Sequence, residues 1–457
     1  MKKLKLVSLL TILLLSLTGC LAKTELEDYA YVISVGVDKG SEDKYLVTFQ
    51  IAVPIKIAGE GSQGGKESTS LVTLETDTLY NSISRADSMI SKEITLSHNK
   101  LIVISEELAK SGVQELLNAF VTNREIRPKT SIIVYKGLAK DLLGNLEPIL
   151  EKNPARYYDL LLDSNQYTGY AIDNNLFDFY LSSKDKLSSP YSLLTEPVRE
   201  EESSIEIPSR SKENPDSTPQ KRETSSKSGD STSGDSQTNT AQGGATELND
   251  ATGGSQNKQS SNTNNQGSNQ SENKKTPKTA NIAGVAIFTN DKLVGEIKNE
   301  QILSHVMLLG KLQKVNMDIE DIEDKNKTTV IKVRQIQSPK INVDIIKGIP
   351  KINIVIRLEC DLITSGSQID YTKQENQDKL SKNIKEKLNN DMRIYLHKIS
   401  KEFKADPIGF GNYYKTKIST LEGIKNLDWQ KIFPNSDFNV EFQLHLDTTQ
   451  MVSNQVS

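Results

Sequence analysis

In residues 45–53 a large apolar side chain stands at every second position, beginning with Tyr45, Val47 and Phe49. A period of two is typical of a β-strand that buries one face. An apolar run at 29–37 precedes this stretch, so the pattern predicts two strands that pair through a turn. Similar short apolar runs predict further strands at 71–75, 100–105 and 129–135.

Two stretches between these strands repeat their apolar residues every three or four positions instead. Leu79, Ile83 and Ala86 share one face of a predicted helix, and Asp77 is placed to cap its start. A second helical pattern covers 106–121. The first half of the chain is therefore predicted to mix α-helices with β-strands.

The second half combines strands with the longest helical pattern of the chain. A hairpin is predicted around Asn290-Asp291, and apolar residues recur with helical spacing from Leu380 to Phe403. We expect this long helix to lie across a sheet. The fold class predicted for the whole chain is α+β, multidomain, with antiparallel-rich sheets packed against helices. The remaining predicted elements are a short helix at 301–312 and strands at 329–334, 340–346, 351–362 and 438–446.

A polar segment separates the two halves. From Pro208 to Ala280 its single large apolar side chain is Leu248, and Ser, Asn, Gln, Gly and Thr dominate. Such a composition cannot bury enough surface to offset the entropy of ordering, so we interpret 201–280 as a disordered linker, with an aggregation-prone tract as the alternative. The predicted organisation is a removed signal peptide at 1–19, an N-terminal region at 20–200 of one or two subdomains, this linker, a C-terminal domain at 281–450 and a tail at 451–457.

The start of the chain carries a pattern that predicts a lipid anchor. Basic residues precede an apolar stretch at 6–17, which is too short to span a bilayer. Leu17-Thr18-Gly19-Cys20 ends it, and small residues directly before a cysteine resemble a bacterial lipoprotein signal. Cleavage before Cys20 would leave that residue with diacylglyceryl and N-acyl groups, which suffice for stable anchoring. The alternative is an ordinary secretory signal with a chance cysteine.

The composition of the chain limits the kinds of partner that it can bind. Cys360 is the only cysteine besides Cys20, so a lipidated chain has no intramolecular disulfide. The formal net charge is −4, with 56 basic and 60 acidic residues spread along the sequence. Nothing in this distribution suggests a nucleic-acid partner, and no later apolar run reaches transmembrane length. We therefore predict a protein held at a membrane surface, with lipid as one partner.

The sequence contains no recognisable catalytic or metal-binding motif. The four histidines, His98, His305, His397 and His445, lie far apart and have no zinc-ligand spacing. Neither a nucleophile elbow nor a phosphate-binding loop is present. Cys360 shares the apolar face of a predicted strand, which indicates a buried core thiol and not a reactive one. We predict no enzyme activity, no cofactor and no metal.

Two other motifs have structural interpretations. His98 precedes a predicted strand, and we expect it to hydrogen-bond a turn. Gly409 and Gly411 follow a helix without the Lys-Ser/Thr pair that a phosphate loop needs. We expect these glycines to provide a positive φ or close packing.

Several motifs occur in a recognisable order. They are the stretch 97–109, Glu125-Ile126-Arg127 followed by 131–137, the hairpin residues 284–288 and 291–295, the stretch Asp406-Pro407-Ile408-Gly409-Phe410-Gly411, and Trp429 with Phe433. In this order they resemble the Ger(x)C family of spore germination lipoproteins, the C subunits of nutrient germinant receptors. The resemblance covers nearly the whole chain except the linker.

The resemblance implies a lipoprotein on the outer face of the spore inner membrane, acting with the membrane-embedded A and B subunits of the receptor. Together they would turn nutrient binding into ion release and germination. It also implies mixed α/β domains without a recognised active site, and hence a non-catalytic scaffold or coupling subunit. The alternative is a solute-binding lipoprotein of a membrane transporter, which requires two domains of alternating parallel βα units around a ligand cleft.

Overall fold

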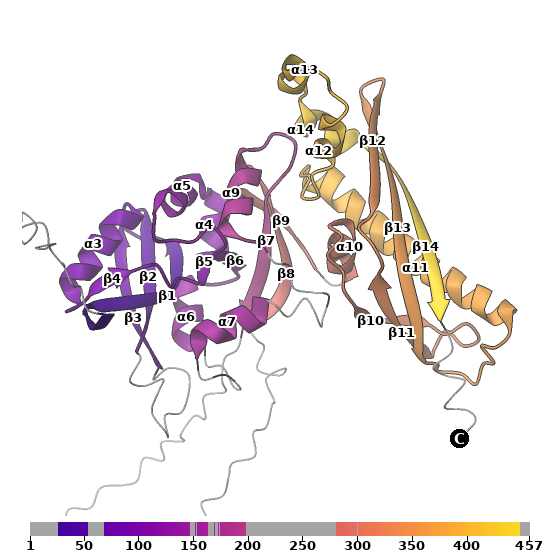
Figure 1. The fold of residues 1–457 in the computed structure, drawn as a ribbon, viewed down its shortest axis with the longest axis horizontal. Coiled ribbons are helices and arrows are strands. Elements are labelled where there is room, and N and C mark those ends of the chain that lie inside the picture. Colours follow the sequence, from indigo (N-terminus) through magenta and orange to yellow (C-terminus); the bar gives the residue numbers. More distant parts are fainter. Residues whose placement is uncertain are drawn as a thin grey trace, which may run out of the picture. The chain divides into compact units, whose positions relative to one another are not determined.

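The computed structural model describes residues 26–53, 68–146, 153–162, 174–197, 280–298 and 300–447, together with residues 151, 169 and 172. A first domain is built on a nine-stranded sheet and a second domain on a five-stranded sheet (Figure 1). The predicted lipid site at Cys20, and nearly all of the predicted linker at 201–280, lie outside the described residues.

Parallel strands form the centre of the first sheet. β1, β5, β6 and β7 pair in parallel, within the order β3-β2-β1-β5-β6-β7-β8-β9, and β4 also pairs with β1. All residues of β5 and β6 are buried, as expected for parallel strands covered on both faces. The strands are β1 Tyr29–Lys39, β2 Tyr45–Ala52, β3 Thr69–Thr76, β4 Glu93–Thr95, β5 Leu101–Ser105, β6 Ser131–Tyr135, β7 Tyr191–Pro197, β8 Ala280–Thr289 and β9 Lys292–Ile297.

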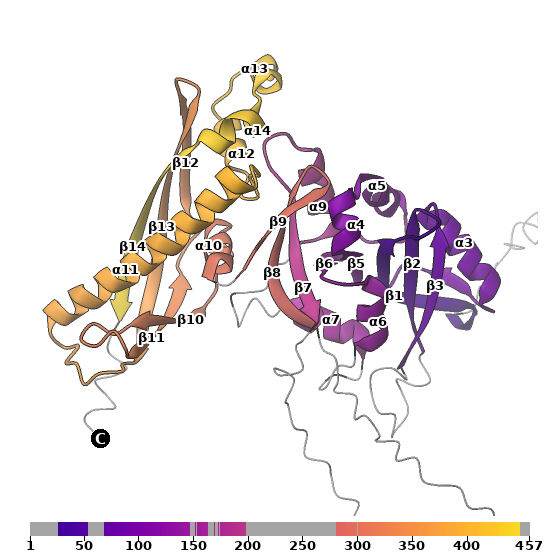
Figure 2. The same ribbon diagram turned by 180° about the vertical axis from the view of Figure 1, so that it is seen from behind.

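Helices cover both faces of this sheet and divide its core in two (Figure 2). Ile102 and Ile104 of β5 pack in one cluster with residues of α3, α4, α5 and α9. Leu101 and Val103, which alternate with them, pack in another cluster with residues of α6 and α7. The helices are α3 Leu79–Met89, α4 Glu106–Ser111, α5 Gln114–Thr122, α6 Ala139–Asn145, α7 Pro154–Leu162 and α9 Leu176–Lys184, preceded by a short 3₁₀ turn Leu26–Asp28.

Two local predictions in this domain need correction. The stretch 106–121 is not one helix, because α4 ends before Gly112, which has a φ of 113°. Only glycine adopts that conformation without strain, so the chain turns there and α5 begins anew. The cap of α3 is Thr78 and not Asp77, since the Thr78 side chain accepts a hydrogen bond from the Asn81 N–H.

The predicted hairpin around Asn290 forms, but it belongs to the first sheet. β8 pairs antiparallel with β7, with Pro197 opposite Ala280, and β9 pairs with β8. The Asp291 carboxylate also accepts a hydrogen bond from Gln114 N–H at 3.0 Å, which ties the hairpin turn to α5. The sequence patterns place this hairpin in the region after the linker, whereas its two strands extend the first sheet. The segment between β7 and β8 therefore starts and ends at neighbouring strands of that sheet.

The second sheet is mostly antiparallel. β13 pairs along one edge with β11 and then β12, and along its other edge with β14 in parallel. β10, which the sequence patterns missed, pairs with β11. The strands are β10 Val315–Glu320, β11 Thr328–Gln335, β12 Lys340–Ile346, β13 Ile349–Thr364 and β14 Asp437–Asp447.

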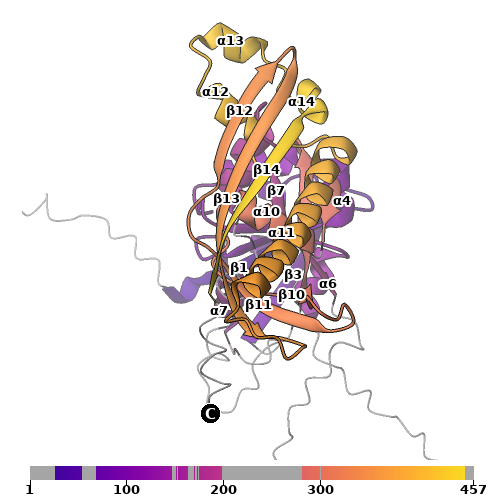
Figure 3. The ribbon, with the colours of Figure 1, turned by 90° about the vertical axis from the view of Figure 1, so that its right-hand side faces the viewer.

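The long predicted helix is α11, Gln374–His397, which continues into a π-helical turn, Lys398–Glu402. Its apolar face packs with β13, since Leu388 and Met392 share one core cluster with Ile354 and Ile356. Figure 3 shows α11 running over the sheet, as the sequence predicted. The other helices of this domain are α10 Glu300–Leu308, α12 Phe410–Lys415, α13 Leu421–Asn426 and α14 Trp429–Ile432, the last followed by a 3₁₀ turn Phe433–Asn435.

The fold is therefore a mixed α/β arrangement with two sheets and a long helix in its C-terminal part, in agreement with the predicted class. The parallel centre of the first sheet was not predicted. The second sheet has one parallel pair, β13 with β14, among its described strands. Two domains of alternating parallel βα units, as the solute-binding alternative requires, are thus not what the described residues form.

Candidate functional site

The structure describes one of the two cysteines. Cys20 lies outside the described residues, and its lipidation stays a prediction. Cys360 is fully buried in β13, and burial raises the pKa of its thiol to about 12. This confirms the predicted core role of Cys360, because a thiol with such a pKa is unreactive at neutral pH. Among the helices that the structure describes, none has the length and apolar character to cross a bilayer.

The histidines lie apart in the fold as they do in the sequence. In the described part of the chain, no three His, Cys, Asp or Glu side chains gather closely enough to hold a metal ion. The Nδ1 atom of His98 lies 3.0 Å from the Ser97 hydroxyl, and its ring packs edge-on against Tyr31. His98 therefore has the turn-stabilising contact that the sequence predicted.

Asp406 is a buried carboxylate of the second domain that accepts three hydrogen bonds. One of its oxygens accepts a hydrogen bond from Gly409 N–H at 2.9 Å, and the other accepts from Gly411 N–H at 3.1 Å and Trp429 Nε1–H at 2.9 Å. Burial raises the pKa of Asp406 to about 6, against the lowering effect of these donors. The carboxylate thus joins the turn before α12 to α14.

The same residue also holds a segment that leads into β7 of the first domain. Ser189 N–H donates to the Asp406 carbonyl at 2.8 Å, and Asp406 N–H donates to the Ser189 hydroxyl at 3.0 Å. Gly411 packs so closely there that a Cβ would lie 2.5 Å from the carbonyl oxygen of Leu187. We call Ser189, Asp406, Gly409, Gly411 and Trp429 the Asp406 junction.

The two glycines of the junction have the roles that the sequence predicted. Gly409 adopts a φ of 73°, in the left-handed region, just before α12. Gly411 allows the close approach of Leu187. Neither glycine cradles a phosphate, because their N–H groups are occupied by the Asp406 carboxylate.

A second buried contact lies beside β7. The Nδ1 atom of His305 on α10 lies 2.6 Å from the Tyr395 hydroxyl on α11, and its ring packs edge-on against Tyr191 of β7. Burial lowers the pKa of His305 to about 3, so the ring is neutral at physiological pH. Its geometry indicates a structural role, since the ring is fully enclosed.

Motifs that are separate in the sequence meet at these contacts. Phe433 lies against both Trp429 and Phe410, with its ring centroid 5.8 Å from that of Trp429 and 6.3 Å from that of Phe410. In the first domain, the Glu125 carboxylate accepts a hydrogen bond from Leu96 N–H at 2.6 Å. Sequence reasoning found each motif, but it had no signal for which motifs touch.

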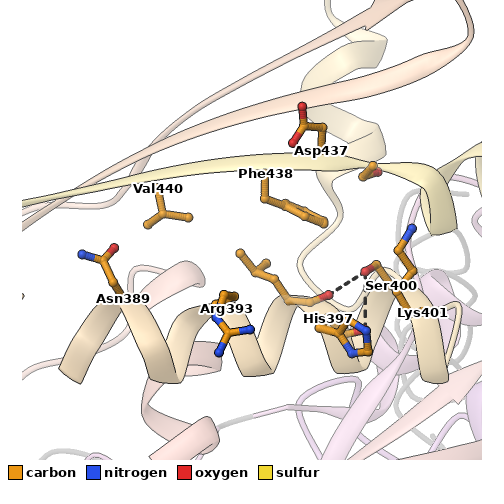
Figure 4. A pocket seen from close by; sticks show the side chains of 10 residues that line it. Asn389, Arg393, His397, Ser400, Lys401, Asp437, Phe438 and Val440 are labelled. Carbon is orange, nitrogen blue, oxygen red and sulfur yellow. Dashed lines mark hydrogen bonds between the residues drawn. The ribbon is translucent and has the colours of Figure 1, made fainter. Parts of the chain in front are cut away.

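The second domain also carries a groove between α11 and β14, with a volume of about 420 Å³ (Figure 4). We call it the α11–β14 groove. The apolar side chains along it are those of Leu396, Phe438 and Val440. The other lining residues are Asn389, Arg393, His397, Ser400, Lys401, Ser436 and Asp437. No sequence pattern indicated this groove, since its two walls, formed within 389–401 and 436–440, are separate stretches of the sequence.

The groove has the chemistry of a binding surface. Basic side chains border an apolar floor, which suits a partly apolar ligand with negative charge. Ser400 donates its hydroxyl proton to the Leu396 carbonyl at 2.7 Å. Among the lining residues that the structure describes, no nucleophile is hydrogen-bonded to a basic side chain.

Two family models match this chain. Residues 22–195 match a model described as the spore germination protein N-terminal domain, and residues 283–450 match one described as spore germination B3/GerAC like, C-terminal. The stretch between them contains the predicted linker. The second model begins within β8, although β8 pairs with β7 in the first sheet.

Individual relatives agree with these models. The YfkR protein of Bacillus subtilis (strain 168) is 21% identical over 93% of this chain and 91% of its own length. Spore germination protein KC of the same organism is 29% identical over 35% of this chain, and the match spans 41% of that protein. A crystal structure of the GerBC protein superposes with a TM-score of 0.48 and 16% identity, covering 90% of this chain and 96% of that one.

Proposed function

Since this chain belongs to the GerAC family of spore germination proteins, we propose that it is the lipid-anchored C subunit of a nutrient germinant receptor. In this proposal it lies on the outer face of the spore inner membrane, held by acyl chains on Cys20. It acts with the membrane-embedded A and B subunits as a non-catalytic scaffold that couples nutrient binding to germination.

The single observation that supports this proposal most is the pairing of two sequence features. Family models match residues on both sides of the linker, and the lipoprotein-like Leu17-Thr18-Gly19-Cys20 stretch precedes the first of them. Acyl chains on Cys20 would be sufficient for stable membrane attachment without a spanning helix. Two buried polar groups of the second domain, Asp406 and His305, are engaged in packing contacts, which also favours a scaffold.

Replacing Cys20 tests the anchor. In spores that carry Cys20→Ala as the only copy, we expect the protein to leave the membrane fraction and nutrient-triggered germination to fall, because unmodified chains lack the acyl groups. Cys360→Ala is the matched control, since it removes the other thiol, and the protein should stay in the membrane fraction. Full membrane retention and normal germination of the Cys20→Ala strain would refute the proposal.

A further inference from the structure

We propose that the α11–β14 groove binds an acidic, extended segment of a partner protein, which adds as a strand to β14. The groove combines an open strand edge, an apolar floor and a basic border. Binding of such a segment to the groove does not depend on the lipidation of Cys20.

β14 has one edge that is open to a further strand. Among the described strands, β14 pairs only with β13, through eleven residue pairs from Asp437 to Asp447. A strand with one unpaired edge can accept a further strand through its free N–H and C=O groups. Phe438 and Val440, on the side that faces α11, are only partly buried and would contact every second residue of an added segment.

Basic side chains of α11 and the turn after it border the groove. Arg393, His397 and Lys401 follow one another at intervals of four residues, so they lie on one side of the helix and border the groove. The groove contains one acidic side chain, Asp437, which is already paired with Lys351 at 2.5 Å. The groove therefore presents excess positive charge to an incoming segment.

These basic groups are available for an acidic ligand. The Arg393 guanidinium donates to the neutral Asn390 side chain at 3.1 Å, and Lys401 donates to the Pro434 carbonyl at 2.6 Å. In the described part of the chain, neither is paired with a carboxylate. His397 lies 3.7 Å from Glu402, an exposed contact that contributes little.

The Ser436 hydroxyl offers an additional contact to a ligand in the groove. Ser436 lines the groove just before β14 and is 8% exposed, yet its hydroxyl has no hydrogen-bond partner among the described residues. A buried polar group without a partner is costly, and a ligand carbonyl or carboxylate would satisfy it. The strand edge distinguishes a peptide from a lipid headgroup, because a headgroup has no backbone to pair with β14.

The test uses the full chain purified in detergent and a fluorescein-labelled decapeptide in which valine and glutamate alternate. We expect saturable binding by fluorescence anisotropy that weakens as salt is raised. The double variant Arg393→Glu/Lys401→Glu should bind at least about tenfold more weakly, since repulsion replaces attraction. Lys385→Glu is the matched control, because Lys385 is exposed on the same helix outside the groove, and its affinity should stay within about twofold of the unmodified chain.

Two further probes separate the strand-addition mechanism from simple charge attraction. A peptide of the same sequence with an N-methyl group at every residue should lose binding, because neither of its edges can then pair along β14. Equal binding of both peptides, or of the double variant and the unmodified chain, would overturn the proposal. So would binding of dihexanoyl-phosphatidylglycerol, a soluble anionic lipid, by a chain that does not bind the peptide. Thermal unfolding of each variant confirms that it is folded.

Discussion

Ser189 and Asp406, 217 residues apart in the sequence, hold each other by two hydrogen bonds. The Ser189 N–H donates to the Asp406 carbonyl at 2.8 Å, and the Asp406 N–H donates to the Ser189 hydroxyl at 3.0 Å. Both residues are buried, so each of these groups would be left without water if its partner were removed. The pair joins the segment before β7 to the turn before α12.

Removing the Ser189 hydroxyl should weaken this hydrogen-bonded contact between Ser189 and Asp406. In Ser189→Ala the Asp406 N–H loses its acceptor, and we expect the free energy of unfolding to fall by about 1 to 3 kcal/mol in urea titrations. Ser304→Ala is the control, because Ser304 is equally buried but its hydroxyl has no partner among the described residues. The role assigned to Ser189 is wrong if both variants lose the same stability.

Asp406 should make the folded state less stable as the pH rises. Burial raises its pKa from 3.8 to about 6, so the folded state binds this proton more tightly than the unfolded state. The stabilising contribution is present below about pH 4 and is lost as the pH rises through about 6. From pH 4 to pH 7, the unmodified chain should lose about 2 kcal/mol relative to Asp406→Asn, measured by urea unfolding. Parallel pH profiles for the two proteins would contradict this assignment.

His305 should make the folded state less stable as the pH falls. Burial lowers its pKa from 6.5 to about 3, so the unfolded state binds the proton more tightly. Its contribution is present above about pH 6.5 and is lost as the pH falls toward 3. Between pH 7 and pH 5 this amounts to about 2 kcal/mol of unfolding free energy. In His305→Gln, whose amide can still bond the Tyr395 hydroxyl, that loss should be absent from urea unfolding curves recorded at the two pH values.

The segment between β7 and β8 should be removable. Because Pro197 and Ala280 are register partners, a short connection can replace it without moving either strand. Deleting residues 202–275 makes the loop about tenfold shorter. The smaller entropy cost of closing this loop should raise the free energy of unfolding by at most about 2 kcal/mol. Differential scanning calorimetry measures this, and a melting temperature lowered by more than about 5 °C would show that the segment contributes to packing.

The sequence alone determined most of the individual elements. Alternation marked β2 and β14, helical spacing marked α11, and the apolar face shared by Cys360 and Ile356 identified a buried strand. These features are local, because a repeating pattern records which face of one element is buried. The spacing of the apolar residues in these patterns was enough to predict a mixed α/β chain with a long helix.

Only the tertiary structure decided how the elements combine. It paired β8 with β7, placed parallel strands at the centre of the first sheet, and brought Asp406 to Trp429 and Ser189. It also formed the α11–β14 groove from two elements that are separate in the chain. The physical reason is that periodicity shows that a face is buried but not what buries it, since strand partners and long-range hydrogen bonds depend on the packing of the whole fold.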